Sequence, residues 1–492
     1  MNQDYILLLP IAWPLLAGIV TFFVKKILSE RKLFCGFVFA AMLLEVIFTG
    51  LCLTGTRSLM FWKITERLEI SFRVDTVSKL FAALVVIVWL LVGTFAFEYM
   101  KHGEHEELFF GFYLIVEMAL VALCFADNMI TYYVFFELMT LTSLPLVLHE
   151  MTHKAVLAGL KYLFYSVVGA FMALFGIFFL SSYGALGSFA AGGILDIPAV
   201  EGNTGLLYVC AILMIVGFGT KAGMFPMHGW LPTAHPEAPA PASAVLSGII
   251  TKMGVLGIIR VVYFVIGPDL LRGSWVQYVW MGLALTTVFL GSMLAYKEKV
   301  TKKRFAFSTV SQVSYILFGL SCMHPVAFVG ALLHVIFHSA IKNTLFMSAG
   351  AFIYKTGKTR VEELKAIGKE MPIVIWCFTL VSIALIGIPP TSGFISKWYL
   401  ATGSLGTHIP VFCWLGPVIL LISALLTAGY LLPITIRGFF PGHDFDYSTL
   451  KSKEPNALMT IPMLILTVAA VLLGMFPNGL VNLITSVAAT IF

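Results

Sequence analysis

Seven ionisable residues occur where a membrane protein rarely keeps charge, inside or at the broken ends of long apolar segments. They are Glu137, Lys221, Lys252, His334, His338, Lys342 and Lys397. A charged side chain at the centre of a bilayer costs about 2.5–3.5 kcal/mol on insertion scales, so it normally has a partner or faces a water-filled cavity. All seven groups can gain or lose a proton. Their number in one chain indicates a line of proton-transfer sites rather than helix packing alone.

Three of these residues share one face of a predicted helix. His334, His338 and Lys342 are spaced i, i+4 and i+8 in GALLHVIFHSAIKNTLF, and this spacing places them one above another. Histidine changes charge near neutral pH, which favours a proton relay. Polar packing remains an alternative. A zinc, copper or haem site is the third possibility, but no third ligand is visible and Lys342 would repel a cation, so we expect no metal-binding and no cofactor-binding residues.

Glu137 and Lys221 are the natural candidates for a movable ion pair. Glu137 is the single acidic or basic residue of TYYVFFELMTLTSLPLVL, and Lys221 comes just before Pro226. Burial disfavours a charged lysine and a nearby carboxylate favours it, so a pair that opens and closes would switch the lysine between releasing and holding a proton. The alternatives are a fixed ion pair and a lysine that snorkels to the interface. Lys252 lies too deep to snorkel, and a fixed partner is its alternative.

Two apolar segments are interrupted by proline and glycine beside a lysine. GFGTKAGMFPMHGWLP (217–232) contains Lys221, and LIGIPPTSGFISKWYL (385–400) contains Lys397. Proline removes a backbone donor and kinks a helix. Such breaks are tolerated in lipid where protein or water satisfies the freed carbonyls, and paired broken helices are typical of ion sites in transporters. The Pro-rich stretch PMHGWLPTAHPEAPAP, with His235, is interpreted as a structural turn through which a proton could also pass.

The composition places all these residues in an all-α polytopic membrane protein. Hydrophobic residues make up 59% of the 492 residues and charged residues 11%, against about 25% charged in an average soluble domain. About fourteen segments are long enough to span a bilayer. They lie near 5–24, 33–54, 77–99, 108–126, 128–149, 155–183, 205–225, 241–266, 276–296, 305–323, 325–353, 372–390, 392–436 (two crossings or a break) and 456–475. No linker divides them, so residues 1–492 are predicted to form a single membrane domain.

Loop charges predict the orientation. The basic loops 25–32, 297–304 and 355–369 follow odd-numbered helices and fall on one side, which the positive-inside rule makes cytoplasmic. Both termini then face out, and the first helix is retained rather than cleaved. Residues 55–76 are expected to form an external hairpin. The seven cysteines are scattered without a CxxC spacing, so neither disulfides nor a metal cluster is expected.

Several of these stretches, in order along the chain, resemble one known family. They are YYVFFELMTL (132–141), TKAGMFPMHGWLPTAHPEAPAPASAVLSGIITKMGV (220–255), KKRFAFSTVSQVSY (302–315), HVIFHSAIKNTLF (334–346) and GIPPTSGFISKW (387–398). Roughly residues 75–440 resemble the antiporter-like subunits of respiratory complex I, of Mrp-type multisubunit Na⁺/H⁺ antiporters and of membrane-bound group 4 hydrogenases. A short internal likeness between 160–171 and 341–352 also favours a duplicated architecture.

The resemblance implies about fourteen transmembrane helices with two inverted five-helix repeats. Helices 1–3 would occupy 1–100, the first repeat (helices 4–8) 101–266, the second (helices 9–13) 272–438, and helix 14 would lie in 439–492, with helices 7 and 12 broken. It implies that Glu137 on helix 5 pairs with Lys221 on helix 7. Lys252 would follow on helix 8, His338 and Lys342 on helix 11, and Lys397 at the end of the path.

The implied function is a proton-translocating subunit of a multisubunit complex in the plasma membrane, moving H⁺ with or without exchange for Na⁺. The absence of a long lateral helix and the lysine at Lys397 favour an Mrp D-type or complex I N-type subunit, or its hydrogenase counterpart. No extramembrane region could hold a redox centre, so any NADH:quinone oxidoreductase-like or hydrogenase-like reaction would belong to partner subunits. Whether the chain is part of an enzyme stays open, and a stand-alone secondary solute carrier is the alternative function.

Overall fold

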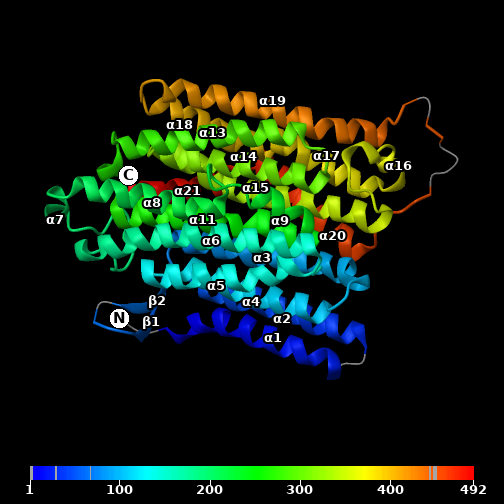
Figure 1. Cartoon of the computed structure of the whole chain (residues 1–492), viewed down its shortest axis with the longest axis horizontal. Helices are drawn as coiled ribbons and strands as arrows, with labels where there is room; N and C mark the ends of the chain where they lie inside the picture. The colour runs from blue at the N-terminus through cyan, green and yellow to red at the C-terminus, as the bar shows by residue number, and fades with distance from the viewer. Residues whose placement is uncertain (1–3, 28–29, 67, 443–444, 447–450) are drawn as a thin grey trace.

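Helices that run side by side dominate the computed structural model, which describes residues 4–27, 30–66, 68–442, 445–446 and 451–492 (Figure 1). Twelve helices in this described part are long and apolar enough to cross a membrane, and two shorter apolar helices accompany them. The prediction of an all-α, multi-pass membrane protein is confirmed. The count of fourteen crossings and the two inverted repeats remain predictions.

The N-terminal part combines three long helices with one hairpin. Its elements are η1 (Tyr5–Leu8), α1 (Leu9–Ile27), α2 (Arg31–Cys52), β1 (Ser58–Lys63), β2 (Glu69–Arg73), α3 (Thr76–Tyr99) and η2 (Met100–His102). The strands pair antiparallel with Ser58 opposite Arg73, which agrees with the hairpin predicted for 55–76. Asp75 then caps α3, because its carboxylate accepts a hydrogen bond from the backbone N–H of Ser78 at 2.7 Å.

The middle part contains the first predicted repeat. Its elements are α4 (Glu106–Phe125), α5 (Met129–Leu148), α6 (His153–Leu180), η3 (Ser181–Tyr183), α7 (Ile197–Glu201), α8 (Thr204–Ala222), α9 (Leu231–Glu237), α10 (Ala240–Val245), η4 (Leu246–Ile250), α11 (Thr251–Ile259) and η5 (Arg260–Ile266). The helix from Ala240 to Ile266 is the most enclosed span in the molecule. Its segments η4 and η5 are π-helical, a geometry that occurs frequently at functional sites.

The remaining elements include one long central helix, α15. They are α12 (Pro268–Leu271), α13 (Trp275–Lys297), α14 (Thr301–Ser321), α15 (Pro325–Thr356), η6 (Val361–Glu363), α16 (Ile367–Glu370), α17 (Pro372–Ile386), α18 (Ser392–Gly406), α19 (Phe412–Phe439), α20 (Ala457–Met475) and α21 (Asn478–Ile491). Helix α15 packs against α14, α17, α18, α20, α21 and η4. It therefore connects the two halves of the chain.

Both predicted breaks occur, and both follow a glycine with positive φ. Helix α8 ends at Gly223 (φ +79°) and α17 at Gly387 (φ +91°). Each break also contains a cis X-Pro peptide bond, Phe225–Pro226 in the first and Pro389–Pro390 in the second. Because glycine adopts positive φ without steric cost, it can end a helix abruptly within the bundle.

A further interruption lies near the C-terminus, where the sequence pattern predicts a single helix beyond residue 456. Instead, α20 stops at Met475 and α21 begins at Asn478, because Pro477 between them lacks a backbone donor. The end of α20 lies against the second break, since a Cβ atom on Gly474 would be 2.2 Å from the backbone nitrogen of Ser392. Any side chain at this glycine would push the two segments apart.

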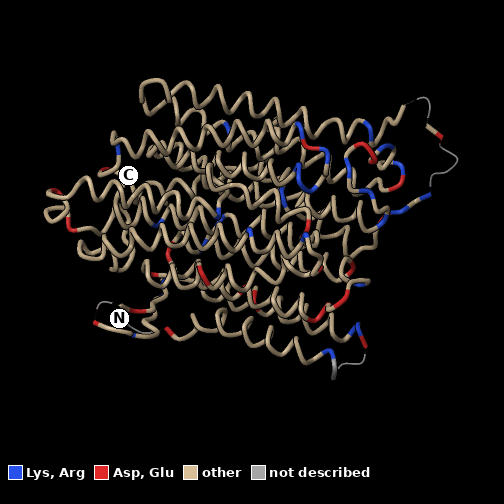
Figure 2. The backbone as a smooth tube through the Cα atoms, in the orientation of Figure 1, with Lys and Arg blue, Asp and Glu red and all other residues tan. Residues whose placement is uncertain are grey.

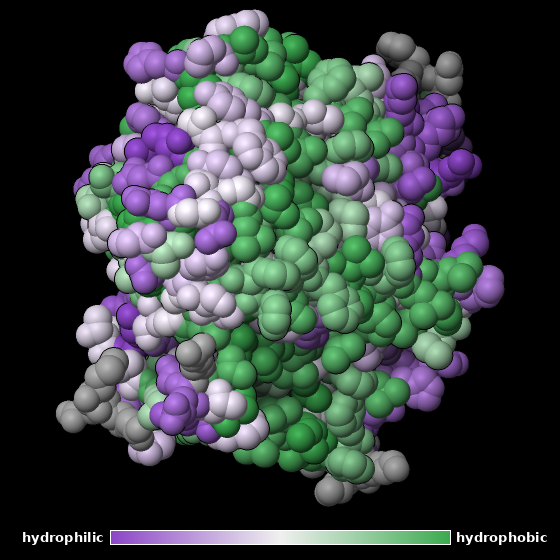
Figure 3. All heavy atoms as spheres, turned by 60° about the vertical axis from the view of Figure 1, so that its left-hand side comes forward, coloured by the Kyte–Doolittle hydropathy of each residue, from purple (hydrophilic) through white to green (hydrophobic). Residues whose placement is uncertain are grey.

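Charges are unevenly distributed over the molecule. The right-hand edge in Figure 2 carries dense clusters of Lys and Arg, whereas a few blue positions lie deep among the helices. Both termini lie at the opposite, left-hand edge (Figure 1), as predicted for termini on one side. Between polar areas the surface is broadly apolar (Figure 3), as a lipid-facing surface requires.

Candidate functional site

Lys221 lies in a closed cage of hydroxyl and aromatic groups at the end of α8. Its Nζ donates to Thr140 Oγ1 at 2.8 Å, Tyr162 OH at 2.9 Å and Ser166 Oγ at 3.0 Å. It also lies 4.3 Å from the centroid of the Tyr162 ring, within range of a cation–π interaction. Three acceptors match the three donors of an ammonium group. The cage can therefore hold the lysine without a carboxylate.

Glu137 lies near this cage but is not joined to it. The carboxylate is partly buried on α5 and accepts a hydrogen bond from Tyr133 OH at 3.3 Å. Among the described residues, no carboxylate lies within ion-pair distance of Lys221. The expected Glu137–Lys221 pair is thus open in this structure, because the Lys221 ammonium donates its hydrogen bonds to hydroxyl groups instead.

Lys252 is positioned by the π-helical segment η4. Its Nζ lies 2.5 Å from the carbonyl oxygen of Ser247 and 3.3 Å from Thr251 Oγ1, and the side chain is fully buried. The absence of a side chain on Gly248 lets α15 approach here, since a Cβ atom at this position would lie 1.9 Å from Asn343 Nδ2. This close approach brings Lys252 within reach of α15.

The third contact of Lys252 connects the two halves of the chain. Its Nζ lies 2.7 Å from Nδ1 of His338 on α15. Along the same helix, the ring centroids of His338 and His334 are 5.8 Å apart. His334 Nδ1 lies 2.9 Å from Ser396 Oγ on α18. A row of proton-transfer groups thus runs from the first half of the chain to the element that follows the second break.

Lys397 occupies the end of this row. Its Nζ donates to the carbonyl oxygens of Leu385 at 2.6 Å and Ile386 at 2.9 Å, which are the last free carbonyls of α17. A cation at a helix C-terminus interacts favourably with the helix dipole. The Nζ also lies 5.1 Å from the ring centroid of Tyr315, and this ring stacks on His334. Lys397 is partly buried, so this end of the row approaches the protein surface.

Lys342 lies on a side branch rather than between His338 and Lys397. Its Nζ donates to Ser308 Oγ at 2.6 Å and to the Phe305 carbonyl at 3.2 Å, both on α14. Ser308 Oγ in turn lies 2.6 Å from Tyr430 OH. Because residue numbers on α15 increase from the terminus-bearing edge to the basic edge (Figure 1), Lys342 extends the site toward the basic edge.

His235, interpreted from the sequence as part of a structural turn, is a buried group close to the row. It is fully buried on α9, and its ring stacks on Phe346 of α15 with centroids 4.7 Å apart. Neither ring nitrogen has a hydrogen-bond partner among the described residues, and the same holds for Nε2 of His334 and His338. Buried polar groups ordinarily have a protein or water partner. Water is the remaining class of partner for these nitrogens.

Among the described residues, no group of three His, Cys, Asp or Glu side chains is arranged to hold a metal ion. No direct hydrogen bond joins Lys221 to Lys252 in this part of the chain either. The backbone of α11 nevertheless passes close to α8, because a Cβ atom on Gly254 would lie 3.0 Å from Lys221 Cβ. Proton transfer across this gap needs water or a change of side-chain conformation.

A family model described as NADH:quinone oxidoreductase/Mrp antiporter, TM, matches residues 126–427, and one described as NADH-Ubiquinone oxidoreductase (complex I), chain 5 N-terminus, matches residues 62–110. The chain belongs to the NADH:quinone oxidoreductase/Mrp antiporter family. The resemblance inferred from the sequence is therefore confirmed. The family match includes all seven site residues, although it does not test their roles.

Alignments with individual relatives cover most of the length of this chain. It is 30% identical over 443 residues to the D-type Na(+)/H(+) antiporter subunit of Bacillus subtilis, covering 88% of this chain and 86% of the relative. It is 28% identical over 427 residues to the N-type NADH-quinone oxidoreductase subunit of Desulforudis audaxviator, covering 83% and 82%. A chain in the Mrp complex from Dietzia sp. DQ12-45-1b has the same fold, with a TM-score of 0.84 at 22% identity over 100% of this chain and 98% of that chain.

Three of the hydroxyl groups that contact the candidate residues were not predicted from the sequence. Thr140 and Tyr162 hold Lys221, and Ser396 contacts His334. Serine, threonine and tyrosine are common at helix interfaces, where they form ordinary interhelical hydrogen bonds. Nothing in their spacing separates those two roles. The sequence also did not show the order of the groups in the row. His334, and not Lys342, contacts the helix that follows the second break.

Proposed function

We propose that this family member carries protons across the membrane along Lys252, His338, His334 and Lys397, with Lys221 and Glu137 as the switch at one end. The supporting observation is the 2.7 Å contact between Lys252 Nζ and His338 Nδ1, which joins helices from the two halves. A proton can pass along such a contact because each group can both accept and donate it in turn. Lys342 and His235 form the branch toward the basic edge.

The switch works by competition for the Lys221 ammonium. In the arrangement described above, hydroxyl groups hold it and Glu137 is separate. Moving Glu137 into ion-pair distance would stabilise the ammonium, and moving it away would favour release of the proton. Driving one charge against 100 mV requires about 2.3 kcal/mol. A change of two units in proton affinity supplies about 2.7 kcal/mol, so the switch is large enough.

In the proposed orientation the basic edge faces the cytoplasm. Figure 2 shows Lys and Arg positions gathered at that edge, and cytoplasmic loops carry an excess of Lys and Arg. Both termini then face the outside of a plasma membrane. The proposed partners are other membrane subunits, as in the Mrp complex that shares the fold. Within that setting the chain acts as a D-type Na⁺/H⁺ antiporter subunit or as its counterpart in a complex I-like or hydrogenase-like pump.

Two experiments test the proposal. Mass spectrometry of partners that copurify with the tagged chain in mild detergent separates the assemblies. Redox subunits among the partners would identify a redox-driven pump. Small membrane subunits without redox subunits would identify an Mrp-type antiporter. Recovery of the chain without partners would overturn the multisubunit proposal in favour of a stand-alone carrier.

Proton movement is then followed in everted vesicles that contain the complete assembly, started with Na⁺ or with the redox substrate of the partners. Lys252→Gln is expected to reduce proton movement to that of vesicles lacking the chain. Lys303→Gln is the matched control, because Lys303 pairs with Glu298 at the exposed basic edge. Normal transport by Lys252→Gln would contradict the proposed path.

A further inference from the structure

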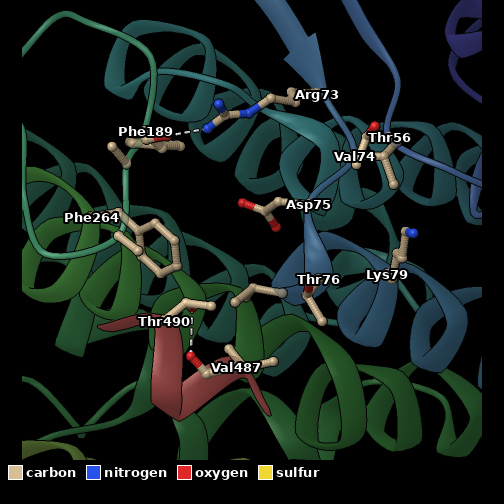
Figure 4. Close-up of a pocket in the computed structure, with 13 residues that line it drawn as sticks. Thr56, Arg73, Val74, Asp75, Thr76, Lys79, Phe189, Phe264, Val487 and Thr490 are labelled. Carbon is tan, nitrogen blue, oxygen red and sulfur yellow. Dashed lines mark hydrogen bonds between the residues drawn. The ribbon is translucent and has the colours of Figure 1, made fainter. Parts of the chain in front are cut away.

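A continuous groove runs between α3 and α21 at the terminus-bearing edge of the molecule. Two cavities form it, one of about 380 Å³ and one of about 340 Å³, and both are lined by Thr76 and Lys79. Figure 4 shows the first cavity, with Asp75 and Lys79 extending from the start of α3 opposite Val487 and Thr490 of α21. The first cavity is the polar mouth of the groove, and the second is its apolar floor.

The mouth carries one more positive charge than its ion pairs neutralise. Arg73 pairs with Asp127 at 2.8 Å, and Arg260 pairs with Asp75 at 2.5 Å. Among the described residues, no carboxylate lies within ion-pair distance of Lys79. Burial raises the pKa of Asp75, but the Arg260 guanidinium and hydrogen bonds from Arg260 and Ser78 outweigh burial and lower the pKa to about 2. Asp75 therefore stays ionised and paired, and Lys79 remains available to an anion.

The floor of the groove is almost entirely hydrocarbon. Its apolar lining consists of Leu80, Ala83, Leu84, Ile87, Ile336, Leu480 and Leu483. From Thr76 to Ile87 the groove follows α3 for eleven residues, which at 1.5 Å per residue is about 16 Å. This length is close to half of a hydrocarbon core of about 30 Å. The groove thus has the length of one acyl chain in one leaflet, below a charged mouth.

We propose that this groove binds one anionic phospholipid of the leaflet on the terminus-bearing side. Its phosphate lies at Lys79, in the mouth that Thr56 and Thr76 also line. One acyl chain lies between α3 and α21. A lipid fits better than a transmembrane helix of a partner, because an unpaired cation at one end of an apolar groove matches a phosphate joined to an acyl chain.

The bound lipid covers the outer side of the helix that carries both histidines. Ile336 of α15 lines the floor of the groove, and it lies two residues from His334 and two from His338. Successive residues on a helix turn by about 100°, so a side chain two residues away faces the opposite side. The acyl chain therefore closes the membrane side of α15 while the histidines face the interior.

Native mass spectrometry of the complete assembly tests this site. The assembly is exchanged into detergent with equal amounts of a phosphatidylglycerol and a phosphatidylcholine of the same acyl chains. Retained phosphatidylglycerol is expected to exceed phosphatidylcholine. Lys79→Gln removes the cation at similar length and should reduce this preference about fivefold, the effect of one lysine near a headgroup. Lys63→Gln, on the hairpin at the same edge, is the matched control and should leave the preference unchanged.

A second variant tests the floor independently of charge. Ala83→Phe fills the groove and should displace both lipids while the assembly remains intact. Equal retention of the two lipids by the unmodified protein, or an unchanged preference in Lys79→Gln, would overturn the proposal. A disulfide crosslink from Ile87→Cys to a neighbouring subunit would overturn it as well, because it would place a protein segment in the groove.

Discussion

Replacing His338 with glutamine tests the contact that joins the two halves of the protein. His338 is fully buried, and its Nδ1 lies 2.7 Å from Lys252 Nζ. Glutamine keeps a polar side chain of similar reach but cannot take up a proton at physiological pH. The substitution therefore preserves packing and a hydrogen bond while it removes the proton acceptor.

The expected effect follows from the partners that remain. Without the imidazole, Lys252 Nζ keeps the Ser247 carbonyl and the Thr251 hydroxyl, and neither can carry a proton onward. Hydrogen bonds to charged groups contribute about 1.5–3 kcal/mol. If the row is used, the lost step raises the barrier by at least that amount, which slows transport roughly 10- to 100-fold.

The assay is the initial rate of proton movement in everted vesicles that contain the complete assembly, normalised to the amount of assembled protein. Thr344→Val is the matched control on the same helix, because its hydroxyl donates only to the Ala340 carbonyl one turn earlier. The control should transport at the rate of the unmodified protein. Both variants should copurify with the same partners.

One result would refute the proposed path directly. If His338→Gln transports within about twofold of the unmodified protein, the lost step contributes less than about 0.5 kcal/mol, and protons do not pass through this imidazole. Equal slowing of the Thr344→Val control would instead attribute the effect to packing of α15.

Three further substitutions test other contacts of the bundle. Ser396→Ala removes the hydroxyl 2.9 Å from His334 Nδ1 and should slow transport with unchanged thermal stability; full activity would place the path elsewhere. Asp75→Asn leaves Arg260, which is 1% exposed, without its carboxylate and should lower the free energy of unfolding by about 3–5 kcal/mol. The pKa of Asp75 is lowered to about 2, whereas an ordinary aspartate titrates near pH 4. The loss of stability in Asp75→Asn should therefore be complete above about pH 4 and vanish as the pH falls through 2. A difference in thermal unfolding midpoint between the two proteins that does not change with pH would contradict this reasoning. Glu117→Leu replaces a fully buried carboxyl group with no hydrogen-bond partner among the described residues and should preserve or raise the unfolding midpoint, whereas a lower midpoint would show that the carboxyl group is bonded.

Much of the fold could be predicted from the sequence because a bilayer restricts the choices. Apolar runs of sufficient length must be helices there, since no other open structure satisfies the backbone. The break near Pro226 was equally visible, because proline cannot continue a helix without losing a hydrogen bond. The interruption at Pro477 carries the same local signal. It was harder to recognise because the apolar run from α20 into α21 offers no buried charge beside the break.

The candidate residues could be singled out from the sequence, but the contacts among them could not. A lysine such as Lys252 is conspicuous in an apolar run, because its cost of burial is large. Its partner His338 is 86 positions away, and the π-helical turn that directs one toward the other has no sequence signature in LSGII. For the same reason, the sequence did not show that Lys342 contacts α14. Helical spacing puts His334 and Lys342 on one face, but which of them reaches α18 depends on how the helices are stacked.

The two ends of the row differ from its centre in a way that bears on coupling. Lys252 and His338 are fully buried, so their protonation can change only through adjacent groups or enclosed water. Glu137 and Lys397 are partly buried and lie on α5 and α18, which are far apart in the bundle (Figure 1). A partner protein that packs on either helix can change the local charge there without entering the centre. Under the proposed function, the row would receive a signal at one partner surface and pass it to the other. The open Glu137–Lys221 arrangement would be the state in which such a signal has most effect, because the lysine is then held by neutral hydroxyl groups alone.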